Sequence, residues 1–332
     1  MVRASPKPKH TKAYKSRENF LSSWENFVPE KVNQKCCRLL LSVHKKTSRL
    51  AVLGELGRHP LFIKSVAHCL NYKLHLNLKK DPKSILINLM TEMRSMADKD
   101  QDCWLTRVQN MEKLLNSPKL SGPSKTSGKC ILSFLRTVFE KFWHEQVNKV
   151  KLGPDNKNHN KLRTYSTLKQ RFGQEPYVNL VRNRNQWMHL TRLRTSAHNL
   201  GIERGRYRNI PIEERFCSCC SSHSTTGTPP PPQPGTPASR SPSATPSSPP
   251  HAPSVDTEFH FLNQCPTFQT NCNCFYGKFS SLDINFSNLN DEQKCVRLLC
   301  PKTAQEAKLT SKSIKTMCEW REKIDDGFSI DN

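Results

Sequence analysis

Four residues in the second half of the chain have types and spacings suited to binding a metal ion. Cys217 and Cys220 are separated by two residues, and His260 and Cys265 by four. Three thiolates and one imidazole suit tetrahedral zinc, and a close cysteine pair with a second pair elsewhere in the chain is common in structural zinc sites. The spacing therefore predicts a zinc-knuckle-like site with structural zinc, which we call the CCHC clasp.

A long insertion separates the two halves of the CCHC clasp. Thirty-nine residues lie between Cys220 and His260, and residues 222–254 are rich in Pro, Ser and Thr. This segment lacks large apolar side chains, so we expect it to be disordered. Lengthening the connection from about ten residues costs roughly 1–1.5 kcal/mol, whereas structural zinc contributes about 10–16 kcal/mol in small fingers. The insertion weakens the predicted site without abolishing it.

Other interpretations of these residues stay open at this point. Cys219 could replace Cys220 as a ligand. The thiols could also carry no metal, and His260 could be an ordinary packed histidine. Three further residues are weaker alternatives as ligands: Cys272, Cys274 and His223.

The charge of the chain indicates a polyanionic partner. Lys and Arg number 52 against 28 Asp and Glu, a formal net charge of +24, and nucleic acid is the commonest partner of so basic a chain. Residues 153–216 combine basic side chains with aromatic ones, which suits phosphate contacts and base stacking. The alternative is a solvated charged face. The predicted contacts are Arg184, Arg192, Arg194, Arg204, Arg206, Arg208, Trp187 and Tyr207. We expect GIERGRYRN, residues 201–209, to form a turn that presents three of these arginines.

Apolar residues recur at spacings of three and four along much of the chain, which predicts a mainly α fold. Asn288 or Asn290 could cap a short helix, and a last helix is expected over 304–324. The predicted organisation is a flexible basic arm over 1–30, a helical domain over 31–152, the basic segment over 153–216, the CCHC clasp with its insertion over 217–265, and a helical segment over 266–332.

The sequence predicts neither a membrane protein nor a secreted one. No apolar run is long enough to span a bilayer, and the first residues lack the apolar core of a secretory signal. Fourteen cysteines in such a chain are expected to be intracellular thiols and metal ligands rather than disulfides. The nucleus and the cytoplasm are not distinguished.

Several motifs together resemble the C-terminal region of the reverse transcriptase polyprotein of non-LTR (LINE-type) retrotransposons, downstream of the polymerase core. They are KKTSRLAVLGELGRHPL, LRTYSTLKQRFGQEPY, LTRLRTSAHNLGIERGRY with the arginine before Cys217, and TEFHFLNQCP. The resemblance implies a polyprotein fragment with a helical region and a Cys/His segment that engages nucleic acid. The residues of the CCHC clasp correspond to that Cys/His set, and the Pro-rich insertion departs from it.

The motifs of catalysis are absent from the sequence. Polymerases position metal ions with paired carboxylates, and the adjacent pair Asp325–Asp326 lacks the expected aromatic context. No phosphate-binding Gly-rich loop or nucleophile motif is found. We therefore predict a non-catalytic nucleic-acid-binding fragment that favours RNA. The alternatives are a scaffold whose Pro-rich loop recruits a polyproline-binding protein, or a transposon relic with no selected activity.

Overall fold

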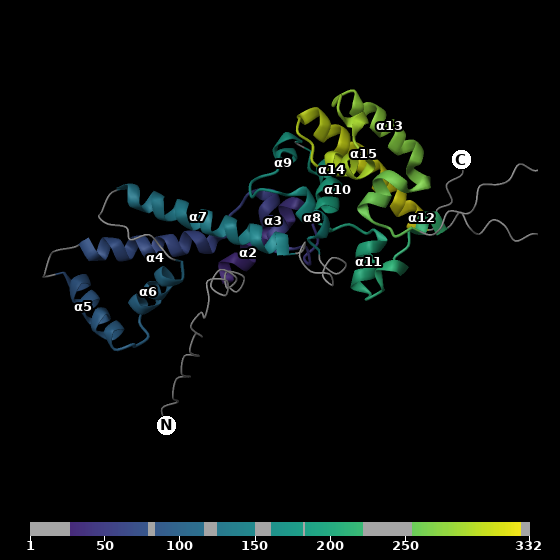
Figure 1. Cartoon of the computed structure of the whole chain (residues 1–332). Coiled ribbons are helices and arrows are strands. Elements are labelled where there is room, and N and C mark those ends of the chain that lie inside the picture. The colour runs from purple at the N-terminus through teal and green to yellow at the C-terminus, as the bar shows by residue number, and fades with distance from the viewer. Residues whose placement is uncertain are drawn as a thin grey trace, which may run out of the picture. The chain divides into compact units, whose positions relative to one another are not determined.

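The computed structural model describes residues 27–78, 84–115, 125–149, 161–181, 183–221 and 254–326. All regular elements in these residues are helical. The β-structure within them is limited to two isolated bridges. The prediction of a mainly α fold is confirmed. The chain divides into two compact units (Figure 1): unit 1 comprises Met1–Cys37 and Gly57–Gln146, and unit 2 comprises Arg38–Leu56 and Val147–Asn332.

Helix α2 (Val28–Leu41) begins within the segment predicted to be a flexible arm. Residues 1–26 of that arm lie outside the described residues. The fully buried Glu30 carboxylate anchors the helix within unit 1, because it accepts hydrogen bonds from the side chains of Asn33 and Gln34 and from the backbone of Leu61, at 2.7 Å. Leu61 begins α4, so the same carboxylate satisfies a free N–H at the start of a second helix.

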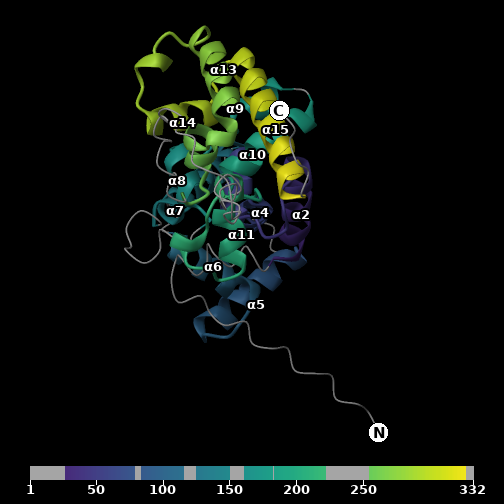
Figure 2. The ribbon, with the colours of Figure 1, turned by 90° about the vertical axis from the view of Figure 1, so that its right-hand side faces the viewer.

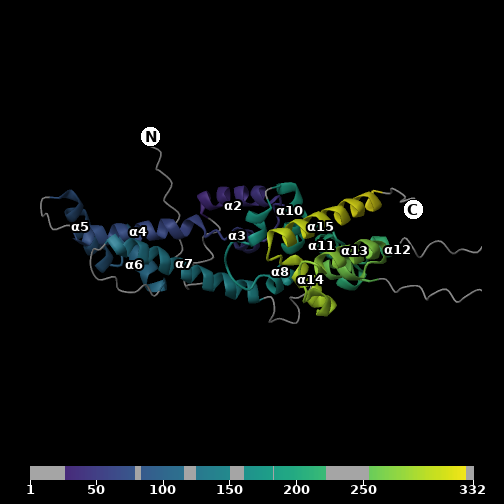
Figure 3. The same ribbon diagram turned by 90° about the horizontal axis from the view of Figure 1, so that it is seen from above.

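Unit 1 is built from long helices. These are α4 (Leu61–Leu78), α5 (Ile85–Asp98), α6 (Trp104–Leu115) and α7 (Lys125–Asn148). Helices α4 and α7 lie side by side in Figures 1 and 3. Their approach is close at Gly128, where an added Cβ would lie 2.4 Å from the Asn71 side chain. His59, just before α4, contacts Glu140 near the other end of α7 at 2.9 Å, so the two helices are antiparallel.

Apart from the buried Glu30 and Gln34, the interior of unit 1 is apolar. Leu76 of α4, Met90 of α5 and Leu105 of α6 form one buried cluster, and Leu135 and Trp143 are buried along α7. Apolar packing therefore joins α4, α5 and α6.

Unit 2 combines short helices with one helix of 22 residues at its C-terminal end. They are α3 (Arg49–Leu56), α8 (Arg163–Leu168), α9 (Pro176–Leu180), α10 (Arg184–Arg194), α11 (Gly201–Tyr207), α12 (Ser218–Ser221), α13 (Gln269–Ser280), α14 (Asp291–Leu299) and α15 (Ala304–Asp325). Helix α15 packs along α10 and α13 (Figure 2). The prediction of a capped short helix is confirmed, because Asn290 and Gln293 form a capping box at the start of α14. The predicted last helix is confirmed as α15.

The units differ from the predicted domain boundaries, because the segment Arg38–Leu56 belongs to unit 2. Two contacts explain this. Tyr165 donates a hydrogen bond to the Ala51 carbonyl at 3.2 Å, and the buried Glu55 pairs with Arg194 at 3.0 Å. The predicted helical domain of 31–152 thus combines parts of both units.

The prediction of a turn over residues 201–209 is wrong, because residues Gly201–Tyr207 form helix α11. The two glycines serve close packing instead. A Cβ at Gly201 would lie 2.9 Å from the Asp256 side chain, and one at Gly205 would lie 2.4 Å from Arg215. The Asp256 carboxylate accepts a hydrogen bond from the Gly201 N–H, so it caps the helix.

Candidate metal centre and nucleic-acid surface

The structure brings the four predicted ligands of the CCHC clasp together. Cys217 precedes α12 and Cys220 lies within it, while His260 opens a π-helical turn (His260–Gln264) that Cys265 follows directly. The ligand atoms of all four residues lie within 4.8 Å of one another, and this group could hold a metal ion.

The distances between the ligand atoms fit a tetrahedral ion. The Cys217 sulfur lies 3.8 Å from that of Cys265, and the Cys220 sulfur lies 4.0 Å from Cys265 and 3.3 Å from Nε2 of His260. Tetrahedral zinc with bonds of about 2.3 Å to sulfur and about 2.0 Å to nitrogen has S–S edges of about 3.8 Å and S–N edges of about 3.5 Å. A disulfide would need sulfurs about 2.0 Å apart, so these cysteines are free thiols.

The chain holds the two ends of the Pro-rich insertion side by side. Phe216 and Val255 form an antiparallel β-bridge. On either side of it, Asp256 N–H donates to the Arg215 carbonyl at 2.9 Å, and Cys217 N–H donates to the Ser254 carbonyl at 3.1 Å. This bridge brings the halves of the clasp together across the insertion. Residues 222–253, including His223 and the predicted polyproline contact, lie outside the described residues.

A buried arginine that sequence reasoning missed supports the clasp. Arg321 of α15 donates to the Asp256 carboxylate at 2.7 Å and to the Ser218 hydroxyl at 2.9 Å, and its guanidinium lies 3.5 Å from the Cys217 sulfur. Hydrogen bonds from Cys219 and Cys265, together with this positive charge, hold the pKa of Cys217 far below its ordinary value despite burial. A thiolate at this position favours metal binding.

The alternative ligands are placed less well. Cys219 is buried, but the four-residue group contains Cys220 instead. Its hydrogen bond to Cys217 raises the pKa of Cys219, so it acts as a thiol donor to that sulfur. Cys272 and Cys274 also lie outside the group. His260 directs Nε2 at the Cys220 sulfur, 3.3 Å away, and its buried Nδ1 has no hydrogen-bond partner among the described residues.

Two of the predicted nucleic-acid contacts lie in the core of unit 2. Arg194 is fully buried, and its guanidinium pairs with Glu55 at 3.0 Å and Glu175 at 2.8 Å. Trp187 is 7% exposed and packs edge-on against Tyr177. The prediction that Arg194 and Trp187 contact nucleic acid does not fit this fold, since Arg194 is fully buried and Trp187 is nearly so.

Three other predicted arginines are bound to neighbouring groups in unit 2. Arg184 is exposed and donates to the Leu39 carbonyl. Arg192 donates through Nε to the Ser42 carbonyl at 3.0 Å, and Arg204 pairs with Asp325 at 3.1 Å. Arg192 and Arg204 also line a cavity, described below.

The remaining predicted contacts lie at the end of α11 and form a basic surface. Tyr207 is 45% exposed, and its ring centroid lies 4.5 Å from the Arg206 guanidinium, 4.8 Å from Nζ of Lys46 and 5.3 Å from Nζ of Lys161. We call these four residues the Tyr207 cluster. Arg208, which follows, is exposed as well. Sequence reasoning missed Lys46 and Lys161, which come from distant segments with no distinguishing pattern.

None of the described helices is long and apolar enough to cross a membrane. No protein-family model, curated protein or solved structure matches the chain. The resemblance to LINE-type polyproteins therefore stays a prediction.

Proposed function

We propose that the protein is a non-catalytic, intracellular nucleic-acid-binding module that favours RNA and carries one structural zinc ion in the CCHC clasp. We further propose that it derives from the C-terminal region of a LINE-type retrotransposon polyprotein. The observation that carries the binding proposal is the Tyr207 cluster, in which three cationic side chains surround one exposed aromatic ring.

The chemistry of the Tyr207 cluster favours a polyanion with exposed bases. Lys46 and Lys161 lie within 5.3 Å of the same ring centroid, so they repel each other by roughly 0.5 kcal/mol in water, whereas Arg206 is paired with the Glu203 carboxylate. Bound phosphates would relieve this repulsion. An exposed ring also offers a surface for base stacking, which is worth about 1–3 kcal/mol per base. Unpaired bases are most accessible in single-stranded RNA and DNA.

Zinc would act by fixing the segment that carries this surface. The clasp joins α12 to the π-helical turn, and Arg321 connects Cys217 to Asp256. Asp256 in turn caps α11 at Gly201, and α11 ends at Tyr207. Holding the clasp closed therefore supports the helix that presents Tyr207. Zinc has no catalytic part in this proposal.

Filter binding of single-stranded RNA, single-stranded DNA and duplex DNA at several salt concentrations tests the proposal. If about five phosphates are neutralised, log affinity for single strands should fall with log salt at a slope of about −3.5. Binding should be tightest for single-stranded RNA. Binding that does not change with salt would contradict the proposal.

The variant Tyr207→Ala tests the assigned surface. Losing one stacked base should weaken single-strand binding about tenfold. Tyr72→Ala is the matched control, because Tyr72 is similarly exposed, at 49%, but lies in unit 1 on α4. Equal losses in the two variants would show that the Tyr207 cluster is not the binding surface.

A further inference from the structure

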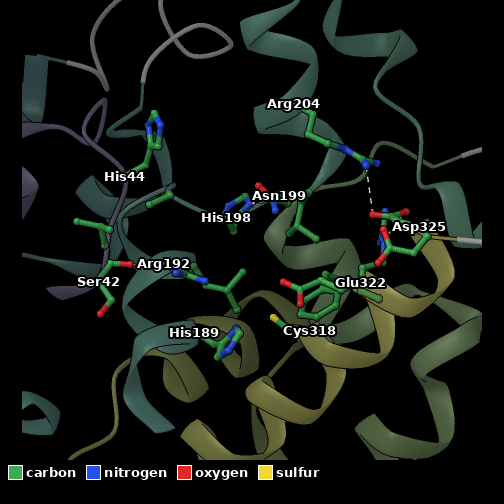
Figure 4. Close-up of a pocket in the computed structure, with 17 residues that line it drawn as sticks. Ser42, His44, His189, Arg192, His198, Asn199, Arg204, Cys318, Glu322 and Asp325 are labelled. Atoms are coloured by element: carbon green, nitrogen blue, oxygen red, sulfur yellow. Dashed lines mark hydrogen bonds and ion pairs between the residues drawn. The ribbon is translucent and has the colours of Figure 1, made fainter. Parts of the chain in front are cut away.

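A cavity of about 730 Å³ in unit 2 shares two chain segments with the Tyr207 cluster (Figure 4). His44 lines the cavity, and Lys46 of the cluster follows it on the same loop. Arg204 of α11 also lines the cavity, and Tyr207 is one turn further along that helix. Helices α10 and α15 complete the walls. A strand bound at the Tyr207 cluster would therefore pass close to the cavity, whose volume is typical of small-molecule sites.

One side of the cavity offers hydrogen-bond donors to an anion. Arg192 is held through Nε by the Ser42 carbonyl, and its two terminal nitrogens have no partner within the described parts of the chain. His44 accepts the Lys46 N–H at Nδ1, 3.2 Å away, which leaves Nε2 to donate. Figure 4 shows both side chains on the same side of the cavity. A guanidinium fixed at one nitrogen presents the other two as a fork, which matches phosphate geometry.

The facing side of the cavity offers acceptors. Glu322 of α15 lies across the cavity from Arg192 in Figure 4, and its carboxylate has no hydrogen-bond or ion-pair partner in the described residues. Asp325 lies beside it but is already engaged by Arg204 and by the Ser218 hydroxyl at 2.7 Å. These carboxylates repel phosphate, so a phosphate must lie on the Arg192 side. Glu322 and Asp326 are therefore the lining carboxylates without a side-chain partner in the described residues, and Glu322 is the one that faces Arg192.

We infer that this cavity takes one unpaired nucleotide of the bound strand, with its phosphate at Arg192 and its base at Glu322, and that it prefers guanine. This inference rests on the proposed function. Guanine carries adjacent N1–H and N2–H₂ donors, which can pair with both oxygens of one carboxylate. Cytosine and adenine offer a single amino group, whereas uracil presents carbonyl oxygens on either side of one N–H. The expected order is guanine, then cytosine and adenine, then uracil.

Titration of the full chain with GMP and with UMP by isothermal titration calorimetry tests the cavity directly. GMP should bind at least about fivefold more tightly than UMP, since a bidentate base contact discriminates by about 1–3 kcal/mol. Arg192→Gln should weaken both nucleotides to a similar degree. Glu322→Gln should remove the preference for GMP and leave UMP binding unchanged.

Matched variants separate these effects from a general change of charge or fold. Arg171→Gln removes an exposed arginine of the same unit that does not line the cavity, and Glu319→Gln removes an exposed carboxylate one turn away on α15. Neither should alter nucleotide binding. Arg192→Lys keeps the charge without the fork and should give an intermediate affinity.

The outcomes distinguish this inference from the proposed function. Suppose that single strands bind in the salt titration but GMP does not bind, or that Glu322→Gln keeps the preference for GMP. Either result overturns the assignment of the cavity as a guanine-preferring nucleotide site and leaves the proposed function standing. If GMP binds with the expected variant pattern while strands do not bind, the cavity assignment stands and the proposed function is overturned.

Discussion

The two units reach their folds by different means. Unit 1 has long helices, with 18 residues in α4 and 24 in α7, and its interior is apolar at positions such as Leu76, Met90 and Leu105. Unit 2 has one long helix, α15 with 22 residues, but several much shorter ones, with 6 residues in α8, 5 in α9 and 7 in α11. Isolated helices shorter than about 12–15 residues are marginal in water. The short helices of unit 2 must therefore be held by tertiary links.

Those links in unit 2 are buried ionic contacts and the CCHC clasp. Arg194 joins α10 to α3 through Glu55. Arg163 of α8 pairs with Glu203 of α11 at 2.6 Å and with Glu258 at 2.8 Å. Such pairs act over long sequence separations, and breaking one leaves an uncompensated charge inside the protein. Unit 2, unlike unit 1, should therefore depend on buried ion pairs and on the metal for its order.

Removal of the metal should have the largest effect. A strong chelator should destabilise unit 2, because structural zinc contributes about 10–16 kcal/mol of folding free energy in small fingers. Hydrogen exchange should then show lost protection in α11 and α12, with protection in α4 and α7 retained. Equal loss of hydrogen-exchange protection in both units would contradict the prediction that unit 2 alone depends on the metal.

Arg194→Leu should give the next largest effect. It leaves the buried Glu55 carboxylate without its cation, which typically costs about 3–5 kcal/mol. Chemical denaturation followed by hydrogen exchange in α10 and α15 measures the loss. The control is Arg184→Leu, an exposed arginine of the same helix, which should change stability by less than about 1 kcal/mol. If the two variants lose similar amounts of stability, the buried pair of Arg194 and Glu55 has no special role in holding unit 2 together.

Leu105→Ala tests the apolar unit in the same way. Leu105 is 2% exposed in the cluster with Leu76 and Met90, and truncating such a residue costs about 2–5 kcal/mol. Denaturation should show unit 1 destabilised, while the zinc content of the chain stays unchanged. A variant that loses zinc would show that the two units do not respond separately.

Acid should give the smallest effect, through Glu306 at the start of α15. Burial raises the pKa of this carboxyl, but hydrogen bonds from Arg297 and from backbone N–H groups outweigh burial and lower it overall. Its contribution to stability is therefore complete above the ordinary glutamate pKa of about 4.5 and is lost as the pH falls below that value. Glu306→Gln should destabilise unit 2 at pH 7 and converge with the parent in acid. Glu319→Gln changes an exposed carboxylate, so the difference in stability between this variant and the parent should not depend on pH in this way.

The sequence predicts the local features of this protein well. Helix α14 and its cap at Asn290, helix α15, and the four residues of the CCHC clasp all follow from periodicity and spacing. These patterns are local, or use residue types with few alternative roles. A close Cys pair suits metal binding wherever its partner pair lies in the chain.

Contacts between distant segments could not be predicted from the same patterns. Arg194 lies four residues after Leu190, on the face that periodicity predicts to be buried, but its charge favours the surface, and its partner Glu55 is 139 residues away. Periodicity does not identify such a pair, so the sequence alone predicts a nucleic-acid contact for Arg194. The glycines of α11 indicate a turn by residue type, yet Gly205 gives space to Arg215. Arg321 beside Cys217 carries no sequence signal at all.

Metal analysis of the purified chain tests whether the CCHC clasp binds zinc. Elemental analysis should find about one zinc per chain in the parent and none in the double variant Cys217→Ser, Cys265→Ser. Cys272→Ser, which changes a buried cysteine outside the clasp, should keep its zinc. Equal zinc in the parent and the double variant, or none in the parent, would contradict the account.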